Sequence, residues 1–267
     1  MSTAKLQTRD GFTLKTRVSG AGIPVVFSNS LGADLSMWDE VVAALDGRVT
    51  AVTYDTAGHG GSSNGSGTLT LEALTDHAMA IAERHSEGTF LFCGLSLGGL
   101  TGMNLAARKP DALGGMVLAN TATAFPPAQM WIDRAEAARV DGMADLVGPT
   151  LDRWLTPAFR ETWPERAEAI ASMIAATPAK GYADCCEVLA ASDVSALLPS
   201  VSCPTVVIAG EHDPSTPPAR AEEIAAGISD ARVEIVPAAH LSSLECPDRF
   251  AEIILSMADK AQQRRVA

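Results

Sequence analysis

A serine stands between two glycines in the segment Gly94-Leu95-Ser96-Leu97-Gly98. This spacing matches the nucleophile-elbow motif, in which a serine sits on a sharp turn between a strand and a helix. Small residues are needed on both sides because the turn brings neighbouring backbone segments close together. The alternative is a glycine-rich turn that holds phosphate, but the segment lacks the Lys-Ser/Thr ending of a P-loop. We therefore predict that Ser96 is a catalytic nucleophile.

A nucleophilic serine needs a general base, and the chain has five histidines. His240 follows the last predicted strand, so a parallel sheet would place it at the carboxyl edge from which Ser96 also emerges. We predict that His240 is the base. His212 neighbours the predicted acid but would point elsewhere, and His59 lies in a glycine loop where it would support the loop or line the pocket. The remaining two histidines are expected on or near a helix, far from this edge and exposed to solvent: His77 and His85.

The acid that orients the histidine should follow a late strand. Asp213 follows the apolar run at 206–209 after three intervening residues and precedes Pro214. The chain order Ser, Asp, His agrees with the order usual for a nucleophile elbow. Glu211 is a nearby alternative. The end of the preceding strand could also carry the acid, but that position is Asn120, which cannot supply the charge that stabilises an imidazolium. We predict that Asp213 is the acid.

The oxyanion of a tetrahedral intermediate needs hydrogen-bond donors. One should be the backbone N–H of Leu97, the residue after the serine, and the other should come from the loop after an early strand. That loop is Asn29-Ser30-Leu31-Gly32, and we choose the N–H of Leu31. Leu31 could equally be an ordinary core residue, because a backbone donor makes no use of its side chain.

Strand-like and helix-like segments alternate along the chain. Apolar or β-branched runs predict strands at 12–18, 24–28, 48–54, 89–93, 113–119, 205–209 and 232–236. Helical spacing predicts helices at 71–84, 97–109, from about 217, and at 250–261, with Thr70 as an N-cap. This alternation indicates an α/β fold with a mostly parallel, doubly wound sheet.

The stretch 124–200 interrupts the alternation. It has a helical pattern, no clear strand, and three of the four tryptophans. We predict an inserted helical cap at 124–200 on a core made of 1–123 and 201–267. The alternative is that the stretch belongs to the outer helical layer of the core.

The composition limits the partners of the protein. Hydrophobic residues make up 47% of the 267 residues and charged residues 19%, which is enough apolar surface for a sizeable core and argues against disorder. The formal net charge of −12 argues against binding to nucleic acid or to an anionic membrane surface.

The five cysteines are odd in number, and their spacing fits neither a zinc site nor a redox pair. The N-terminal segment lacks the apolar region of a signal peptide, and no apolar run is long enough to span a membrane. A cytoplasmic protein with reduced cysteines and no bound metal is the expectation.

These features together resemble the α/β-hydrolase superfamily and, within it, the 3-oxoadipate enol-lactonases of aromatic-acid catabolism. The resembling segments span nearly the whole chain: 28–38, 54–60, 93–102, 131–134, 153–157, 181–186 and 240–245. The elbow and the three catalytic residues occur throughout the superfamily, whereas the Ser-Asn-Ser-Leu-Gly loop and the cap segments are more specific. One departure is Ala57, where the family loop usually has arginine, so this loop lacks the cation that the family carries there.

The resemblance implies an α/β-hydrolase fold with a cap, and hydrolysis of 3-oxoadipate enol-lactone to 3-oxoadipate without a cofactor or metal. The alternatives are another carboxylesterase or lactonase, a cofactor-free haloperoxidase or C–C hydrolase, and a non-catalytic binding protein. The partner would be a small lactone or ester. The sequence leaves open a homo-oligomer, and whether hydrolysis passes through an acyl-enzyme or uses base-activated water.

The implied substrate carries a carboxylate, while the chain and its cap are both acidic overall. A specific cation must then lie over Ser96. Trp131 and Arg134 are three residues apart on a predicted cap helix, so an indole and a guanidinium would share one face. We predict that Arg134 grips the carboxylate and that Trp131 shields the lactone ring. The alternative is an Arg–Glu pair on the surface, with Trp131 in the core of the cap.

Overall fold

A computed structural model describes residues 2–65 and 67–266 of the chain. Eight strands form one sheet in the order β1-β2-β4-β3-β5-β6-β7-β8. Their bounds are β1 Ser2–Gln7, β2 Thr13–Ser19, β3 Pro24–Ser28, β4 Thr50–Tyr54, β5 Phe90–Leu95, β6 Leu113–Ala119, β7 Thr205–Gly210 and β8 Ala231–Val236. The strands from β4 to β8 in this order are parallel, and β1 and β2 add an antiparallel hairpin at one edge. The predicted mostly parallel sheet is confirmed.

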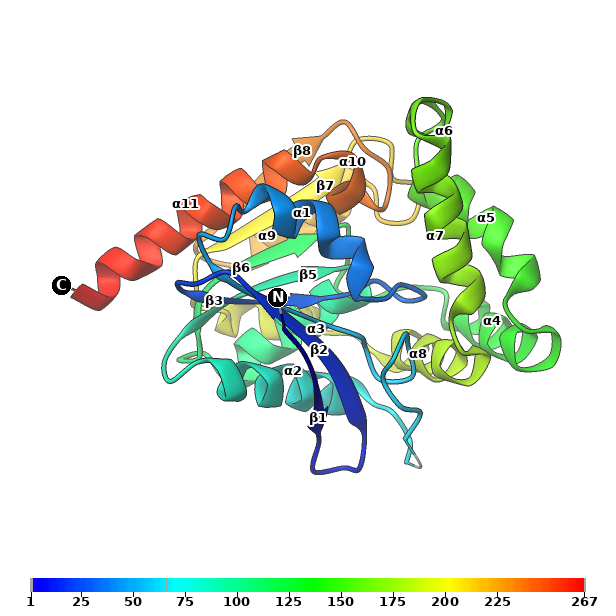
Figure 1. Ribbon diagram of the computed structural model, residues 1–267, viewed down its shortest axis with the longest axis horizontal. Coiled ribbons are helices and arrows are strands. Elements are labelled where there is room, and N and C mark those ends of the chain that lie inside the picture. The colour runs from blue at the N-terminus through cyan, green and yellow to red at the C-terminus, as the bar shows by residue number, and fades with distance from the viewer. Residues whose placement is uncertain (1, 66, 267) are drawn as a thin grey trace.

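Helices cover both faces of the sheet (Figure 1). On one side lie α1 (Asp39–Ala44) and α11 (Pro247–Val266), which pack against each other, and on the other side lie α2 (Leu71–His85) and α3 (Leu97–Arg108). α9 (Pro218–Gly227) packs on β7 and β8. Thr70 caps α2 as predicted, since its side chain accepts from the Ala73 N–H. Because helices cover both faces, β3, β5 and β7 are buried along their whole length.

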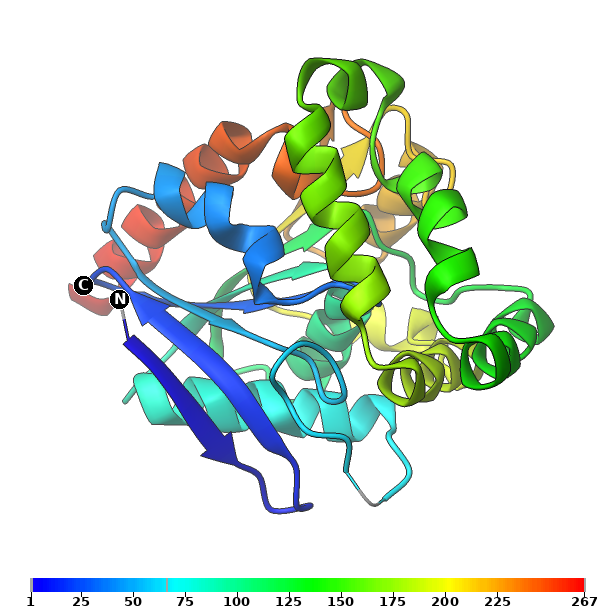
Figure 2. The same cartoon turned by 45° about the vertical axis from the view of Figure 1, so that its right-hand side comes forward.

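Five helices between β6 and β7 stand to one side of the sheet (Figures 1 and 2). They are α4 Ala128–Asp141, α5 Ala144–Trp154, α6 Pro157–Thr162, α7 Pro164–Ala176 and α8 Ala179–Ala191, and a short 3-10 helix, η2 (Ser195–Ser200), leads back to the core. Among the described residues of this stretch, the one β contact is a single bridge between Ala124 and Asp193. The helical pattern read from the sequence is therefore correct, while the boundaries 124 and 200 of the cap remain a prediction.

Among the described residues, no helix combines the length and the apolar character that crossing a membrane requires. All five cysteines are unpaired, and four of them are buried.

Candidate active site

Ser96 occupies a strained turn between β5 and α3. Its φ of 57° and ψ of −112° lie where a residue with a side chain rarely occurs. A Cβ at Gly94 would lie 2.2 Å from the Gly98 carbonyl oxygen, and a Cβ at Gly98 would lie 2.1 Å from the Ser28 carbonyl oxygen. Both glycines are therefore required sterically, as the motif predicts, because the elbow is packed directly against β3.

His240 and Asp213 lie close together at the carboxyl edge of the sheet. His240 follows β8 and Asp213 follows β7, and the ring Nδ1 is 2.8 Å from Asp213 Oδ2. Both side chains are buried, with 5% and 0% of their surfaces exposed. A carboxylate at Nδ1 fixes the tautomer in which Nε2 is free to accept a proton.

Ser96 and His240 line the same cavity. No hydrogen bond joins these two described side chains, and bonds of this kind often tighten only when substrate binds. The fold therefore brings a serine hydroxyl and a candidate base to one cavity.

Asp213 accepts hydrogen bonds at both carboxylate oxygens. Besides His240, its Oδ2 accepts from Thr216 Oγ1 at 2.6 Å and from Asn120 Nδ2 at 2.9 Å, and its Oδ1 accepts from the N–H groups of Ser215 and Thr216. Burial alone would raise the pKa of Asp213, but the charge of His240 and these hydrogen bonds lower it to about 2. The carboxylate is thus held ionised beside the imidazole.

Asn120 is a site residue whose role the sequence did not reveal. It follows β6 with a φ of 44°, and it is buried. Its amide donates to Asp213 and, at 3.1 Å, to the Ala239 carbonyl next to His240, while its oxygen accepts from Ser242 Oγ. Asn120 therefore joins Asp213 to the segment 239–245, which carries His240 and is called the histidine segment below. We classify Asn120 as a positioning residue.

Two backbone N–H groups next to the elbow are unused. Within the described residues, neither the Leu31 N–H nor the Leu97 N–H donates to another group, although both residues are buried. Leu97 is the first residue of α3, where backbone donors have no partner inside the helix. Buried donors without a partner are costly, and two of them beside a serine are suited to hold an oxyanion.

His59 supports the loop that carries Leu31. Its Nε2 accepts from the Gly32 N–H at 3.0 Å, and its Nδ1 lies 3.2 Å from the Ala57 carbonyl oxygen. Burial lowers the pKa of His59 to about 4, with the Ala57 carbonyl opposing this shift. A neutral ring is required, because protonated Nε2 could not accept from Gly32. Of the two roles expected for His59, the structure shows loop support.

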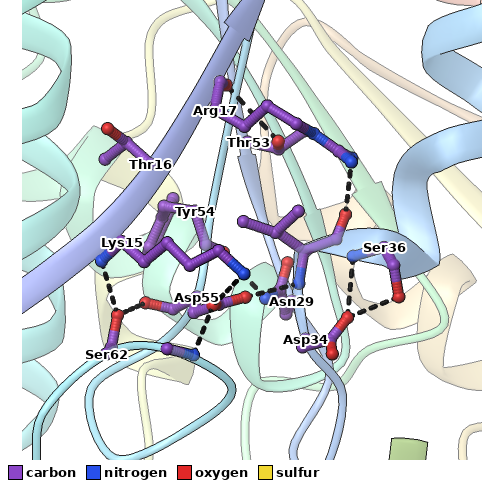
Figure 3. Close-up of polar contacts among 12 residues, drawn as sticks. Lys15, Thr16, Arg17, Asn29, Asp34, Ser36, Thr53, Tyr54, Asp55 and Ser62 are labelled. Carbon is purple, nitrogen blue, oxygen red and sulfur yellow. Dashed lines mark hydrogen bonds and ion pairs between the residues drawn. The ribbon is translucent and has the colours of Figure 1, made fainter. Parts of the chain in front are cut away.

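Asp55 joins the chain just after this loop to the glycine-rich loop that follows β4 (Figure 3). Asp55 accepts from the N–H groups of Leu35 and Gly61, each at 2.7 Å, and Lys15 Nζ lies 3.6 Å from its Oδ2. Burial raises the pKa of Asp55 above its usual value, and these contacts offset only part of the rise. Ala57 is buried and carries no charge, and the cation that contacts the Asp55 carboxylate is Lys15.

The expectation for His77 was wrong. His77 is 2% exposed rather than solvated, and its Nε2 lies 2.8 Å from Asp10 Oδ2. The His77 ring on α2 packs against the Phe12 ring, with 4.9 Å between the ring centres, and this contact buries the histidine. His85 is half-buried and His212 is exposed, and neither lines the cavity.

A cavity of about 330 Å³ lies between the elbow and the helical insertion. Its lining includes Ser96, Leu31 and His240 from the core, and Trp131 and Arg134 from α4. The sequence-predicted binding residues are therefore brought to the same cavity as the catalytic candidates. Other lining residues come from α5, α8 and α9, among them Thr150, Arg153, Trp154, Tyr182 and Arg220.

Arg134 and Trp131 contact each other inside this cavity. The guanidinium carbon lies 5.1 Å from the centre of the indole ring, and the indole N–H donates to the Phe125 carbonyl at 2.7 Å. Within the described residues Arg134 makes no ion pair, so the alternative of an Arg–Glu pair on the surface is not what the structure shows. A half-buried cation without a carboxylate partner can bind an anion.

The insertion is bonded to the histidine segment. The Trp154 carbonyl accepts from the Leu241 N–H at 2.9 Å, and Glu245 accepts from the N–H groups of Thr156 and Ala239 at 3.1 and 3.0 Å. Helix α8 also crosses the loop at Gly58 so closely that a Cβ at Gly181 would lie 2.0 Å from the Gly58 carbonyl oxygen. The wall of the cavity is thereby fixed relative to His240.

Comparisons with known proteins agree with this geometry. Residues 23–247 match the family described as alpha/beta hydrolase fold. Two proteins of Acinetobacter baylyi are each 38% identical to the chain: 3-oxoadipate enol-lactonase 2, over 85% of both chains, and 3-oxoadipate enol-lactonase 1, over 93% of this chain and 94% of that protein. The crystal structure of the enol-lactonase from Burkholderia xenovorans is similar with a TM-score of 0.91 and 36% identity, over 95% of this chain and 99% of that one.

Proposed function

The chain belongs to the α/β-hydrolase family and is a carboxylic-ester hydrolase, and from this premise we propose that it hydrolyses 3-oxoadipate enol-lactone to 3-oxoadipate. One observation carries the proposal. A single small cavity is lined by the candidate nucleophile Ser96, the candidate base His240 and the unpaired guanidinium of Arg134. This combination suits a small cyclic ester that carries a carboxylate. The likeness to proteins named 3-oxoadipate enol-lactonase supports the same substrate.

In the proposed reaction Ser96 Oγ attacks the lactone carbonyl carbon while His240 Nε2 takes the hydroxyl proton. The oxyanion accepts from the N–H groups of Leu31 and Leu97. When the bond from the carbonyl carbon to the ring oxygen breaks, His240 returns the proton to the enol oxygen, and the enol tautomerises to the ketone. Water then hydrolyses the acyl-serine with His240 as base. Direct attack by a water activated by His240 is the competing route to the same product.

Asp213 keeps the imidazole in the tautomer that this sequence of steps needs and stabilises the imidazolium that forms. Arg134 and Trp131 are proposed to bind the substrate carboxylate and to cover the ring. Residues 124–200 act as the cap that carries these two residues. The unpaired cysteines fit a reducing compartment, so a cytoplasmic location is part of the proposal.

The direct test is turnover of synthetic 3-oxoadipate enol-lactone, followed by the loss of its ultraviolet absorbance. We expect wild-type turnover and a loss on the order of 10³-fold or more in Ser96→Ala, with the fold retained. If Ser96→Ala kept more than about a tenth of wild-type activity, nucleophilic serine catalysis would be wrong.

A panel of p-nitrophenyl esters, neutral lactones and β-diketones separates the alternatives. Turnover of neutral esters without turnover of the carboxylated lactone would favour a different carboxylesterase, and cleavage of β-diketones would favour a C–C hydrolase.

A further inference from the structure

The cavity contains more positive charge than one carboxylate contact requires. Three arginines line it, from three different elements, and none of its lining residues is an aspartate or a glutamate. Arg220 at the start of α9 is paired with Glu223 at 2.8 Å. The other two, Arg134 and Arg153, make no ion pair within the described residues.

Arg153 is directed by its neighbours on α5. Its Nη2 donates to Thr150 Oγ1 at 3.2 Å, and Thr150 is a buried residue that also lines the cavity. The adjacent Asp152 forms its ion pair with Arg160, at 2.6 Å, and not with Arg153. Arg134 and Arg153 line the same cavity, and in keeping with this the pKa of Arg153 is lowered by burial and then by the charge of Arg134.

Two like charges that share a small cavity without a carboxylate destabilise the free protein. A surface cation could turn to water instead, but Arg134 and Arg153 are half-buried and line the same cavity. An anionic ligand removes this repulsion. A carboxylate has two oxygens with about four acceptor positions, so it can accept from two guanidinium groups at once.

We propose that Arg153 is a specificity-determining residue that joins Arg134 in a two-guanidinium subsite for the carboxylate of the substrate. The substrate class is then small esters and lactones with a carboxylate remote from the bond that is cleaved. This inference deepens the proposed function and depends on it for the position of the reacting bond. It adds a second cation, from a different helix, to the one that the sequence indicated.

The backbone of Arg153 ties this subsite to the catalytic histidine. The His240 N–H donates to the Arg153 carbonyl at 3.4 Å, and the next residue, Leu241, donates to the Trp154 carbonyl. The last turn of α5 therefore holds the guanidinium at a fixed offset from the imidazole. A carboxylate bound by Arg153 would place the ester carbonyl of a short substrate at a set position relative to Ser96.

The test measures binding by calorimetry, with adipate as the anionic probe and adipamide as its neutral counterpart. Arg153→Met is expected to weaken adipate binding at least tenfold, about 1.4 kcal/mol, while the affinity for adipamide changes less than about twofold. Arg153→Lys keeps the charge but not the fork of donors, so an intermediate loss is expected. Arg139→Met is the matched control, because it removes one cap cation that is paired with Glu187 outside the cavity.

A double variant tests whether the two arginines hold one carboxylate. If they do, Arg134→Met with Arg153→Met should lose less than the sum of the single losses. Two results together would show that Arg153 has only a structural role. Arg153→Met would lose affinity for adipate and adipamide equally, and Arg153→Lys would bind adipate no better than Arg153→Met does. Wild-type protein that binds adipate no better than adipamide would overturn the subsite altogether.

Turnover of the enol-lactone is measured separately. Adipate binding through Arg153 without lactone turnover would refute the proposed substrate and keep the subsite. If the lactone is turned over but adipate affinity is the same in wild type and Arg153→Met, the proposed function stands and the subsite is refuted.

Discussion

At the scale of single residues, the five hydrogen bonds that Asp213 accepts decide what a neutral replacement would do. In Asp213→Asn, an NH₂ group replaces one of the two carboxylate oxygens. At the Oδ2 position it would face the side-chain donors, among them His240 and Thr216, and at the Oδ1 position it would face two backbone N–H groups. We expect turnover to fall on the order of 10⁴-fold, as for the equivalent change in serine proteases, because His240 is held in the wrong tautomer. Unfolding in urea should also show a loss of about 1–3 kcal/mol.

The matched control is Glu211→Gln, two residues away and exposed, which should keep turnover within about a factor of two of wild type. Near-normal turnover of Asp213→Asn would move the role of the acid to another residue.

A second residue-scale prediction concerns Arg134. Arg134→Met removes the guanidinium that lies over Trp131 while it keeps most of the aliphatic stem. We expect KM for the carboxylated lactone to rise by a factor that corresponds to roughly 1.5–3 kcal/mol, the range for a hydrogen bond to a charged group. KM for a neutral ester should change far less. Steady-state kinetics on both substrates check this, and equal effects on the two would remove Arg134 from the substrate site.

The sequence was sufficient to select Ser96, Asp213 and His240 as candidates, because a local motif and the chain order constrain them. The sequence did not show that Asn120 and Thr216 donate hydrogen bonds to Asp213. Asn120 lies 93 residues from Asp213 in the chain, and only the pairing of β6 with β7 brings their ends together. In the sequence Asn120 served only to exclude an acid at that position. Arg153 was seen as part of a cap segment, but no local pattern distinguishes a cation that faces a cavity from one that faces solvent.

At the scale of elements, the loop 29–32 depends on a histidine that must stay neutral. The pKa of His59 is about 4 in the fold, against an ordinary value of 6.5. Between pH 6.5 and pH 4 the unfolded chain takes up a proton at this residue and the folded chain does not, so stability falls as the pH falls. The loss across this window should be on the order of 3 kcal/mol. In His59→Gln this part of the pH dependence should disappear.

Urea unfolding at pH 7.0, 5.5 and 4.5 measures the effect. Glutamine can still accept from the Gly32 N–H through its side-chain oxygen, so we expect the variant to fold, at a cost of about 1–2 kcal/mol at pH 7. His212→Gln serves as the control, since His212 is exposed. If wild type and His59→Gln lost stability in parallel on acidification, the loop would not depend on a neutral His59.

The elements themselves were predictable where burial imposes a pattern. The strands predicted at 24–28 and 113–119 agree with the observed β3 and β6, because strands buried on both faces are continuous apolar runs. Strand β1 was missed. Five of its six residues are exposed and it pairs only with β2 at the edge of the sheet, so its sequence carries no apolar alternation. The short helix α1 was missed for a similar reason, since six residues give less than two turns of periodicity.

At the scale of the whole molecule, hydrogen bonds join the cap to the histidine segment of the core, in addition to the chain connections at the two ends of the cap. Glu245 accepts from both Thr156 and Ala239, and Arg166 on α7 donates to the Leu244 carbonyl at 3.2 Å and pairs with Glu40. The cavity wall that carries Arg134 and Arg153 is thereby fixed to the core that carries Ser96. Substrate selection and catalysis then depend on one cap–core arrangement.

The net charge of the molecule opposes the charge of its cavity. The chain carries −12, so an approaching carboxylated lactone is repelled at long range, while the arginines attract it only at close range. The screening length falls from about 30 Å at 0.01 M salt to about 10 Å at 0.1 M. Added salt should therefore weaken the long-range repulsion more than the contact inside the half-enclosed cavity.

We expect kcat/KM for the carboxylated lactone to rise roughly twofold over this range, while kcat/KM for a neutral ester stays constant. The comparison uses sodium chloride at constant pH, and Arg134→Met should retain the rise because the repulsion comes from the whole surface. A fall in kcat/KM with salt would mean that the cavity, rather than the net charge, controls the approach of the substrate.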